Sequence, residues 1–332
     1  MINVAVVGLG WWGRTIVRLL DGNAKLRVAA GVDVNAAASA DFAKQYKFAL
    51  SADFDAMLRD PGIDGVILCT PHTLHTEQIC KAARAGKHVF CEKPLSLTRA
   101  DVLKAVAACN AAGVALAVGH ERRFEPPILE VQRLATSGEL GTLLQIEANF
   151  SQDKFLTLAA DNWRISDKEA PAGPMTATGI HLLDLSVGLL GPAERAFASV
   201  RQLGSQLTNG DTLGVLVQFK SGANLLISAI LATPFVGRYA VYGNKGWVEV
   251  RDKSHVEAPT GWTMTKCLRG GDPVTTDYPV AQAVRSNLEA FADAAAGRVP
   301  YPVPQEQMIA NVSALEAVFK SAVSGVVERV EG

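Results

Sequence analysis

Two side chains in this sequence of 332 residues have types suited to moving a proton during an oxidation. Lys93 stands in the tripeptide Glu92-Lys93-Pro94, and His181 lies at the centre of a Gly-x-His-x-x-Asp motif. An imidazole with a near-neutral pKa suits a general base, and a lysine ammonium can stabilise a developing alkoxide. Oxidation of a secondary alcohol to a ketone needs both groups and an acceptor for the hydride. The two residues therefore predict this reaction only if the chain also binds a redox cofactor.

A dinucleotide cofactor is indicated by the first residues of the chain. The apolar run Ile2–Val7 is followed by a glycine motif and a helical stretch, and a second apolar run ends in Asp33, 20 residues after the last glycine. This is the setting of the Rossmann fingerprint. Its first glycine permits the turn, the second admits the pyrophosphate, and the third lets helix and strand pack, while the helix N-terminus favours phosphate. The cofactor-binding candidates here are Gly8, Gly10, Trp11, Trp12, Gly13 and Asp33.

Asp33 also predicts which dinucleotide is bound. Its carboxylate would accept hydrogen bonds from the adenosine ribose hydroxyls and repel a 2′-phosphate. No arginine or lysine follows directly, since the next residues are Val34-Asn35-Ala36. The sequence therefore favours NAD over NADP.

The elements that position these residues change in character near residue 121. Before it, apolar strands alternate with helices, as in a parallel sheet covered on both faces. After it, strand-like runs are joined by short turns, which imply antiparallel hairpins. We expect an α/β + α+β chain: an NAD-binding Rossmann domain with a doubly wound parallel sheet over residues 1–120, and a substrate and oligomerisation domain with a mainly antiparallel open sheet over residues 121–332. The last helices, predicted at Ala283–Ala296 and Gln305–Val323, are free to pack back on the first domain, and Pro259–Pro279 is expected to be irregular.

Composition excludes several classes of function. A formal net charge of −1 argues against nucleic acid, which needs a basic face. No apolar stretch reaches the roughly 20 residues that span a bilayer, and the N-terminus lacks the basic region of a signal peptide. The 5 cysteines are odd in number and lack a C-x-x-C spacing, so we expect free thiols in the cytoplasm and no metal site.

Further motifs occur in an order that resembles one family. Thr70-Pro71-His72-Thr73-Leu74-His75 ends a parallel strand, Glu92-Lys93-Pro94 ends the next, and the Gly-x-His-x-x-Asp motif begins a later helix. Together with the glycine motif they resemble the Gfo/Idh/MocA oxidoreductases, named for glucose–fructose oxidoreductase and inositol dehydrogenase. The resemblance covers nearly the whole chain and implies that Lys93 and His181 face the nicotinamide and that a cis bond precedes Pro94. It adds Thr70, Pro71, His72, His75, Glu92 and Lys93 to the cofactor-binding candidates, with His75 expected to be a structural or cofactor-side group rather than a catalyst.

Substrate contacts are predicted from the same resemblance. Arg164 could bind a substrate carboxylate, the cofactor or a structural ion-pair partner, and Asp184 could instead orient its helix or a neighbouring side chain. The substrate candidates are His120, Arg123, Arg164, Thr178 and Asp184.

One position departs from the family pattern. An aspartate often stands four residues before the motif histidine, and here the residue is Ala177. Without that carboxylate, either the substrate supplies a polar group of its own or Lys93 and His181 suffice. We expect NAD-dependent oxidation of a sugar, sugar acid or polyol. A dehydrogenase of cyclic, carboxylated dihydrodiols and an inactive NAD(P)-sensing regulator are the alternatives. The family also implies a homodimer or homotetramer formed through the open sheet, whose strands carry apolar residues on both sides.

Overall fold

The computed structural model describes residues 1–255 and 258–331. The chain divides into two compact units. Unit 1 comprises Met1–Glu121 and Val284–Met308, and unit 2 comprises Arg122–Ala283 and Ile309–Gly332. The segment Val284–Met308 thus belongs with the N-terminal residues. The sequence placed it within residues 121–332 but left the last helices free to pack back on the first domain.

Unit 1 is a parallel sheet with helices on both faces. Its strands lie in the order β3-β2-β1-β4-β5-β6, and each pair is parallel. This is the doubly wound order of a dinucleotide-binding fold, with β1 and β4 at the switch point. The strands are β1 (Ile2–Val7), β2 (Leu26–Val32), β3 (Ala49–Ser51), β4 (Gly65–Leu68), β5 (His88–Cys91) and β6 (Leu116–Val118).

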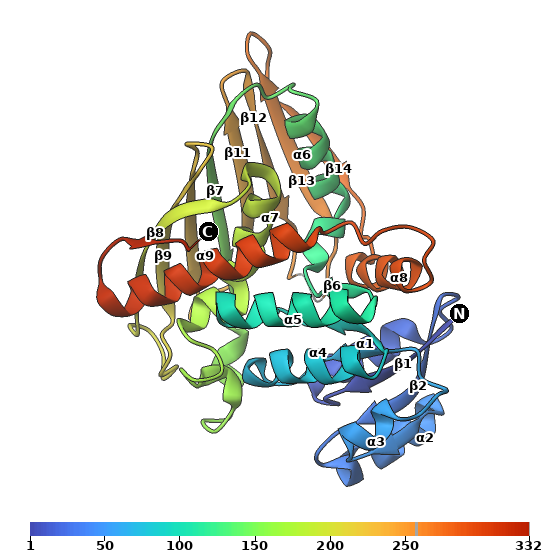
Figure 1. The fold of residues 1–332 in the computed structure, drawn as a ribbon. Helices are drawn as coiled ribbons and strands as arrows, with labels where there is room; N and C mark the ends of the chain where they lie inside the picture. Colours follow the sequence, from blue (N-terminus) through green and yellow to red (C-terminus); the bar gives the residue numbers. More distant parts are fainter. Residues whose placement is uncertain (256–257, 332) are drawn as a thin grey trace. The chain divides into compact units, whose positions relative to one another are not determined.

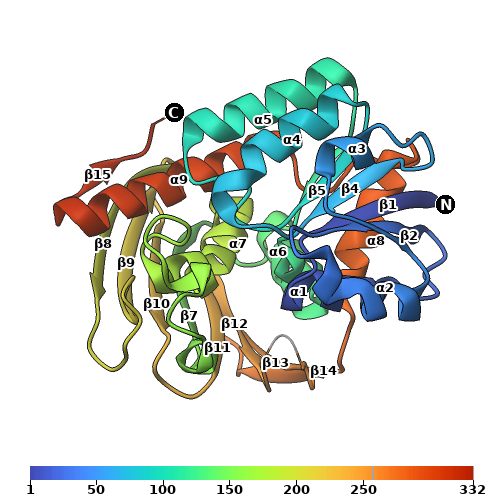
Figure 2. The same cartoon turned by 90° about the horizontal axis from the view of Figure 1, so that it is seen from below.

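Helices cover this sheet in two layers. Figure 2 shows α4 and α5 on one face and α1 and α8 on the other. Leu288, Phe291 and Ala292 of α8 join the apolar cluster under α1, which explains why the late segment belongs to unit 1. Asn287 and Tyr301 strengthen this docking, since both donate a hydrogen bond to the Val118 carbonyl. The helices are α1 (Trp11–Leu20), α2 (Ala40–Tyr46), α3 (Phe54–Leu58), α4 (His75–Arg84), α5 (Arg99–Ala112) and α8 (Ala283–Ala295).

Unit 2 is built on a large, mainly antiparallel sheet in the order β14-β13-β12-β11-β7-β10-β9-β8-β15 (Figure 1). The pair of β7 and β10 is parallel. The strands are β7 (Leu143–Ser151), β8 (Ala193–Arg201), β9 (Thr212–Phe219), β10 (Asn224–Ile230), β11 (Val236–Gly243), β12 (Gly246–Asp252), β13 (Trp262–Leu268), β14 (Val274–Tyr278) and β15 (Glu328–Arg329).

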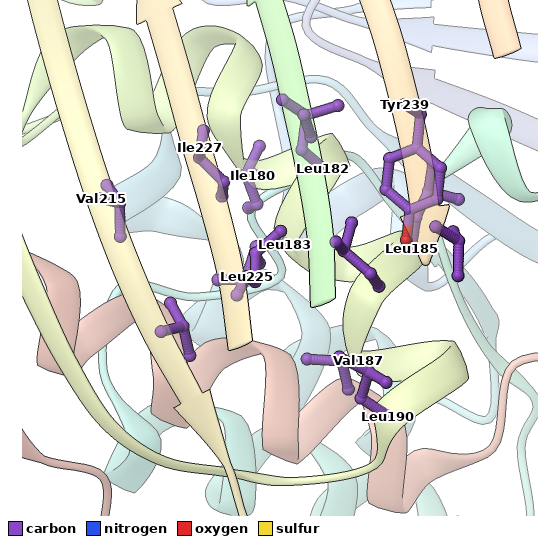
Figure 3. Packing of buried hydrophobic residues seen from close by; sticks show 14 of the residues in the cluster. Ile180, Leu182, Leu183, Leu185, Val187, Leu190, Val215, Leu225, Ile227 and Tyr239 are labelled. Atoms are coloured by element: carbon purple, nitrogen blue, oxygen red, sulfur yellow. The ribbon is translucent and has the colours of Figure 1, made fainter. Parts of the chain in front are cut away.

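One face of this sheet is covered by helices. Residues of α6 (Pro126–Thr136), α7 (Ile180–Leu190) and α9 (Gln305–Ser324) pack against its buried side chains. Figure 3 shows Ile180 and Leu183 of α7 beside Leu225 and Ile227 of the sheet. On the opposite face Phe197, Leu216 and Leu226 are adjacent in register and about two-fifths exposed. The alternation of buried and exposed positions in β9 and β10 produces this open apolar face.

The expectation that Pro259–Pro279 is irregular is wrong. This segment forms β13 and β14, which pair as an antiparallel hairpin. The glycines and prolines of this segment lie at its ends and turn, while the paired positions include four threonines together with Trp262, Val274 and Tyr278, residue types that favour strands. The sequence analysis also missed α6, β3 and β15.

Candidate functional site

The glycine motif of unit 1 forms a tight turn between β1 and α1. Gly8 has a φ of +88°, and a Cβ there would lie 2.7 Å from the Cys69 carbonyl oxygen. A Cβ on Gly13 would collide with the Gly8 carbonyl. Around Gly10, in contrast, a Cβ would meet no atom within 4 Å. Two glycines are therefore required by the protein's own packing, while the third leaves open space at the N-terminus of α1, where a pyrophosphate binds in this fold.

Asp33 holds the glycine turn to the end of β2. Its Oδ2 accepts a hydrogen bond from the Leu9 backbone N–H at 2.7 Å, and its Oδ1 accepts one from Asn35 at 2.8 Å. Each carboxylate oxygen has a second lone pair, so the group can still accept from a ribose hydroxyl. These features fit a bound dinucleotide, and Asp33 shapes the turn.

Arg14 is a cation near Asp33 that the sequence analysis did not name. Its guanidinium donates to the carbonyl oxygens of Leu9 and Ala38, at 3.0 and 2.9 Å, and contacts Ser39. The positive charge thus lies against the turn that follows Asp33. Arg14 reaches this turn from α1 and not from the residues that directly follow Asp33. An arginine in such a place can accommodate a 2′-phosphate, so it weakens the argument against NADP.

The two tryptophans of the glycine motif differ in exposure. Trp11 is 48% exposed, whereas Trp12 packs against the apolar cluster under α1. Their ring centroids are 5.2 Å apart. Trp12 therefore supports the turn, and Trp11 offers a ring face at the protein surface.

His75 connects the loops after two neighbouring strands. It is fully buried at the start of α4. Its Nδ1 lies 2.8 Å from the Pro94 carbonyl oxygen, and its Nε2 lies 3.0 Å from the Thr70 carbonyl oxygen. The ring of the buried His72 lies 5.7 Å away. His75 thereby fixes the backbone on either side of the Lys93 loop, where the bond between Lys93 and Pro94 is cis, as the resemblance implied.

Glu92 brings a partly buried carboxyl group beside Lys93. A Cβ on Gly119 would lie 2.5 to 2.7 Å from the Glu92 carboxyl oxygens, so the carboxyl group packs directly over this glycine. Burial, and then the negative charge of Glu121, raise the pKa of Glu92 to about 7. The Trp12 indole and the Lys93 charge act in the opposite direction. Glu92 can therefore hold a proton near neutral pH.

In unit 2 the motif histidine begins α7, directly after a π-helical turn. This turn, Met175–Gly179, contains Ala177 and Thr178, and the sequence analysis did not predict it. The Thr178 hydroxyl donates to the Pro174 carbonyl within the turn. His181 is 5% exposed, with its ring centroid 6.0 Å from that of Phe150. Single π-helical turns occur often at functional sites, because they re-aim the side chains that follow.

Arg123 and Asp184, two predicted substrate contacts, bind each other. Arg123 donates to both carboxylate oxygens of Asp184, at 2.6 and 2.8 Å, and to its backbone carbonyl. The pair is almost fully buried and ties the entry of unit 2 to α7. Their assignment to the substrate stays a prediction, as does that of the buried His120. The neighbouring Arg122 is likewise held by Glu125 and Asp252.

Arg164 is held in a short turn, Trp163–Ile165. The Asn162 side chain accepts from its backbone N–H, and the Asn209 side chain donates to its carbonyl, both at 3.0 Å. Its guanidinium carbon lies 4.2 Å from the centre of the Trp163 ring. Lys154, which no motif marks, lies near enough to Arg164 that burial and then the Arg164 charge lower the pKa of Lys154 to about 8.

Comparison with known proteins identifies the family. Residues 2–120 match the model of the GFO_IDH_MocA oxidoreductase family with its NAD-binding Rossmann fold, and residues 128–249 match the GFO/IDH/MocA C-terminal domain. The chain belongs to this family. It is an NAD(P)-dependent oxidoreductase, in agreement with the order of motifs in the sequence.

Relatives of this Gfo/Idh/MocA oxidoreductase act on several compounds. An NADP-dependent D-xylose 1-dehydrogenase of Haloferax volcanii is 29% identical over 82% of this chain and 82% of the relative. An inositol 2-dehydrogenase of Rhizobium meliloti is 27% identical over 80% and 81%. The crystal structure of a candidate NADPH-dependent oxidoreductase from Desulfitobacterium hafniense, 25% identical, superimposes with a TM-score of 0.91 over 99% of this chain and 97% of that one.

Metal centres and membrane-spanning helices were searched for in the part of the chain that the structure describes. Among residues 1–255 and 258–331, no group of three or more histidine, cysteine or acidic side chains could hold a metal ion. Within the same ranges no helix is long and apolar enough to cross a membrane.

Proposed function

We propose that this oxidoreductase oxidises a secondary alcohol of a sugar, sugar acid or polyol to a ketone. The observation that supports this most directly is the glycine turn with open space at Gly10, in the same chain as the Lys93 and His181 motifs. Relatives named for xylose and inositol oxidation support a polyhydroxylated substrate. A bound dinucleotide supplies the nicotinamide that accepts the hydride.

In this proposal Lys93 and His181 divide the work of removing a proton. The Lys93 ammonium hydrogen-bonds the alcohol oxygen and stabilises the negative charge that develops as the hydride leaves. His181 accepts the hydroxyl proton as the general base. His75, through the Pro94 carbonyl, and Glu92, through the Lys93 backbone N–H, hold the Lys93 loop.

We further propose NAD as the preferred cofactor. Asp33 accepts from the ribose hydroxyls with its remaining lone pairs, and its charge opposes a 2′-phosphate. Arg14 acts against this preference, because its guanidinium lies at the turn after Asp33. Titrating tryptophan fluorescence with NADH and NADPH decides between the two, and tighter binding of NADPH would overturn the proposal.

The proposed reaction is tested by following NADH formation at 340 nm. The purified protein is offered NAD with sugars, sugar acids, polyols and cyclic dihydrodiols. Turnover of a polyhydroxylated compound supports the proposal. Turnover of dihydrodiols alone would replace the proposed substrate class, and NAD binding without turnover of any compound would favour the sensor alternative.

We also propose that the open face of the unit 2 sheet joins two copies of this chain. Phe197, Leu216 and Leu226 form an exposed apolar row on adjacent strands. Beside them Arg238 pairs with Glu147 and Glu249 on the same sheet. An apolar centre with a charged border suits a two-fold interface, in which each patch contacts its own copy.

A further inference from the structure

Ala172 has a backbone conformation that residues other than glycine rarely adopt. Its φ is +50°, in the left-handed region. Lys47 is the other non-glycine residue of the described chain with a positive φ, and it ends a helix, where a left-handed residue is common. Ala172 instead lies directly before the π-helical turn Met175–Gly179, which leads to His181. Strain of this kind is a feature of functional sites.

Asn209 holds the chain on both sides of Ala172. Its Nδ2 donates to the Ala170 carbonyl oxygen at 2.8 Å, and its backbone carbonyl accepts from the Gly173 N–H at 2.8 Å. A Cβ on Gly173 would lie 2.7 Å from Oδ1 of Asn209, so the amide packs directly against this glycine. A strained residue persists only where the surrounding structure fixes it. Asn209, which is 4% exposed, supplies bonds that fix Ala172.

The same side chain also holds the short turn that contains Arg164. Nδ2 of Asn209 donates a second hydrogen bond, to the Arg164 carbonyl oxygen at 3.0 Å. The neighbouring Thr208 hydroxyl donates to the Ile165 carbonyl oxygen at 2.8 Å. One amide therefore joins two parts of the loop that follows β7. Both of its bonds are donated, so a carboxylate of the same shape could not replace it.

Asn209 can fix other segments because its own loop, between β8 and β9, is held by Asp211. Asp211 is fully buried. Its carboxylate accepts hydrogen bonds from two backbone N–H groups and two hydroxyl groups of this loop and of β9, those of Leu203, Gly204, Ser205 and Thr212. The position of the Asn209 amide is thereby set before it contacts the segment around Ala172.

Hydrogen bonds extend this geometry into the π-helical turn. The Met175 N–H donates to the Ala172 carbonyl oxygen at 2.6 Å, and the Thr176 hydroxyl donates to the Pro171 carbonyl oxygen. His181 is buried at the start of α7, directly after this turn. The direction in which α7 begins, and with it the orientation of the His181 ring, therefore depends on the conformation of Ala172.

We propose that Asn209 is a positioning residue that sets the orientation of His181 through Ala172 and the π-helical turn. This inference rests on the proposed function, in which His181 is the general base. Asn209 acts through the backbone and contacts neither the substrate nor the cofactor. A displacement of about 1 Å at a reacting group can lower the rate about a hundredfold, so a contact far from the chemistry can control it.

The variant Asn209→Asp tests this role, because aspartate keeps the shape of the side chain and donates no hydrogen bond. Asn209→Leu removes the donors without adding a charge. Both variants should lower kcat about tenfold to a hundredfold, with KM and the NADH dissociation constant little changed. The control is Asn162→Asp, because the Asn162 side chain accepts from the Arg164 N–H and a carboxylate can accept in its place. Unchanged kcat in the Asn209 variants, or an equal loss in the control, would overturn the proposal.

A second substitution separates positioning from stability. Glycine adopts the left-handed conformation without strain, so Ala172→Gly removes the need for a residue that fixes it. Added to Asn209→Leu, this change should recover part of the lost kcat. Thermal unfolding of the single and double variants is measured alongside. No recovery of kcat, or a recovery that only follows the melting temperature, would refute the positioning role.

The state of His181 can also be followed without turnover. An NMR titration of the histidine ring protons, with His181 assigned from His181→Gln, reports its environment and its pKa. Both Asn209 variants should shift the His181 signals, and Asn162→Asp should not. Shifted signals in a protein that oxidises no compound would uphold the positioning role and refute the proposed reaction. Unshifted signals with undiminished oxidation of a polyol would uphold the reaction and refute the positioning role.

Discussion

Replacing Glu92 by glutamine should change how the stability of this protein depends on pH. In the folded chain the pKa of Glu92 is raised from 4.5 to about 7, first by burial and then by the charge of Glu121. The folded state therefore binds a proton between these pH values that the unfolded state has released. Stability from this group is fully present below pH 4.5 and is lost as the pH rises to about 7.

The size of this effect follows from the shift in pKa. A shift of one unit corresponds to 1.36 kcal/mol, so a rise from 4.5 to about 7 costs about 3 kcal/mol of folding free energy above neutral pH. Glutamine keeps the shape of the side chain and carries no charge at any pH. The free energy of unfolding of Glu92→Gln, relative to the natural chain, should therefore rise by about 3 kcal/mol between pH 4.5 and pH 8.

Urea unfolding followed by tryptophan emission at a series of pH values measures this difference. Other titrating groups affect both proteins alike and cancel in the comparison. Glu306→Gln, at an exposed position of α9 within unit 1, is the control and should show a constant difference. Glu121→Gln should move the transition to lower pH, because it removes the neighbouring negative charge. A Glu92→Gln difference that does not vary with pH would refute the reasoning.

Three further changes test the cofactor turn and the open sheet face. Asp33→Ser should raise the ratio of kcat/KM for NADP to kcat/KM for NAD at least tenfold, because it removes a repulsion of roughly 1.4 kcal/mol between the Asp33 carboxylate and the 2′-phosphate. An unchanged ratio would contradict the role of Asp33. Gly8→Ala should abolish NADH binding and destabilise unit 1 by roughly 1–3 kcal/mol, because the φ of Gly8 is +88° and an added Cβ would press on the Cys69 carbonyl. A variant that binds NADH as tightly as the natural chain in a fluorescence titration would show that glycine is not required at this position. Leu216→Lys combined with Leu226→Lys should give a smaller species in sedimentation equilibrium, and an unchanged mass would rule out the proposed interface.

The fold of unit 1 could be predicted because its signals are local. Gly8 and Gly13 are required by their immediate neighbours, and the apolar strands alternate with helices at regular spacing. The return of Val284–Met308 to this unit depends on contacts across more than 160 residues, such as that between Asn287 and Val118. The sequence left the last helices free to pack back on the first domain, but no local pattern specifies this contact.

The hairpin of β13 and β14 shows a different limit. Its glycines and prolines are strong turn signals, and they outweighed the weaker strand preference of its threonines, Trp262 and Tyr278. Pairing with β12 then stabilises β13 along its whole length. Tertiary pairing overrides the local composition here.

For the site, the motifs predicted which residues would be important better than they predicted which groups those residues contact. Arg123 and Asp184 were both substrate candidates, with Asp184 alternatively expected to orient its helix or a neighbouring side chain, and they form an ion pair with each other across 61 residues. Lys154 and His255 carry no motif, and their relation to Arg164 and His181 emerges only from the folded sheet and its loops. Arg14 was overlooked because its side chain reaches the turn after Asp33 from another element.

The central claim is that Lys93 serves the chemical step rather than cofactor binding. The most direct test is Lys93→Ala, with kcat measured on the best substrate and the NADH dissociation constant measured by fluorescence. We predict a fall in kcat of about a hundredfold or more, as for loss of a group that stabilises a developing oxyanion, with NADH affinity nearly unchanged. Unchanged kcat, or a loss explained entirely by weaker NADH binding, would contradict the account.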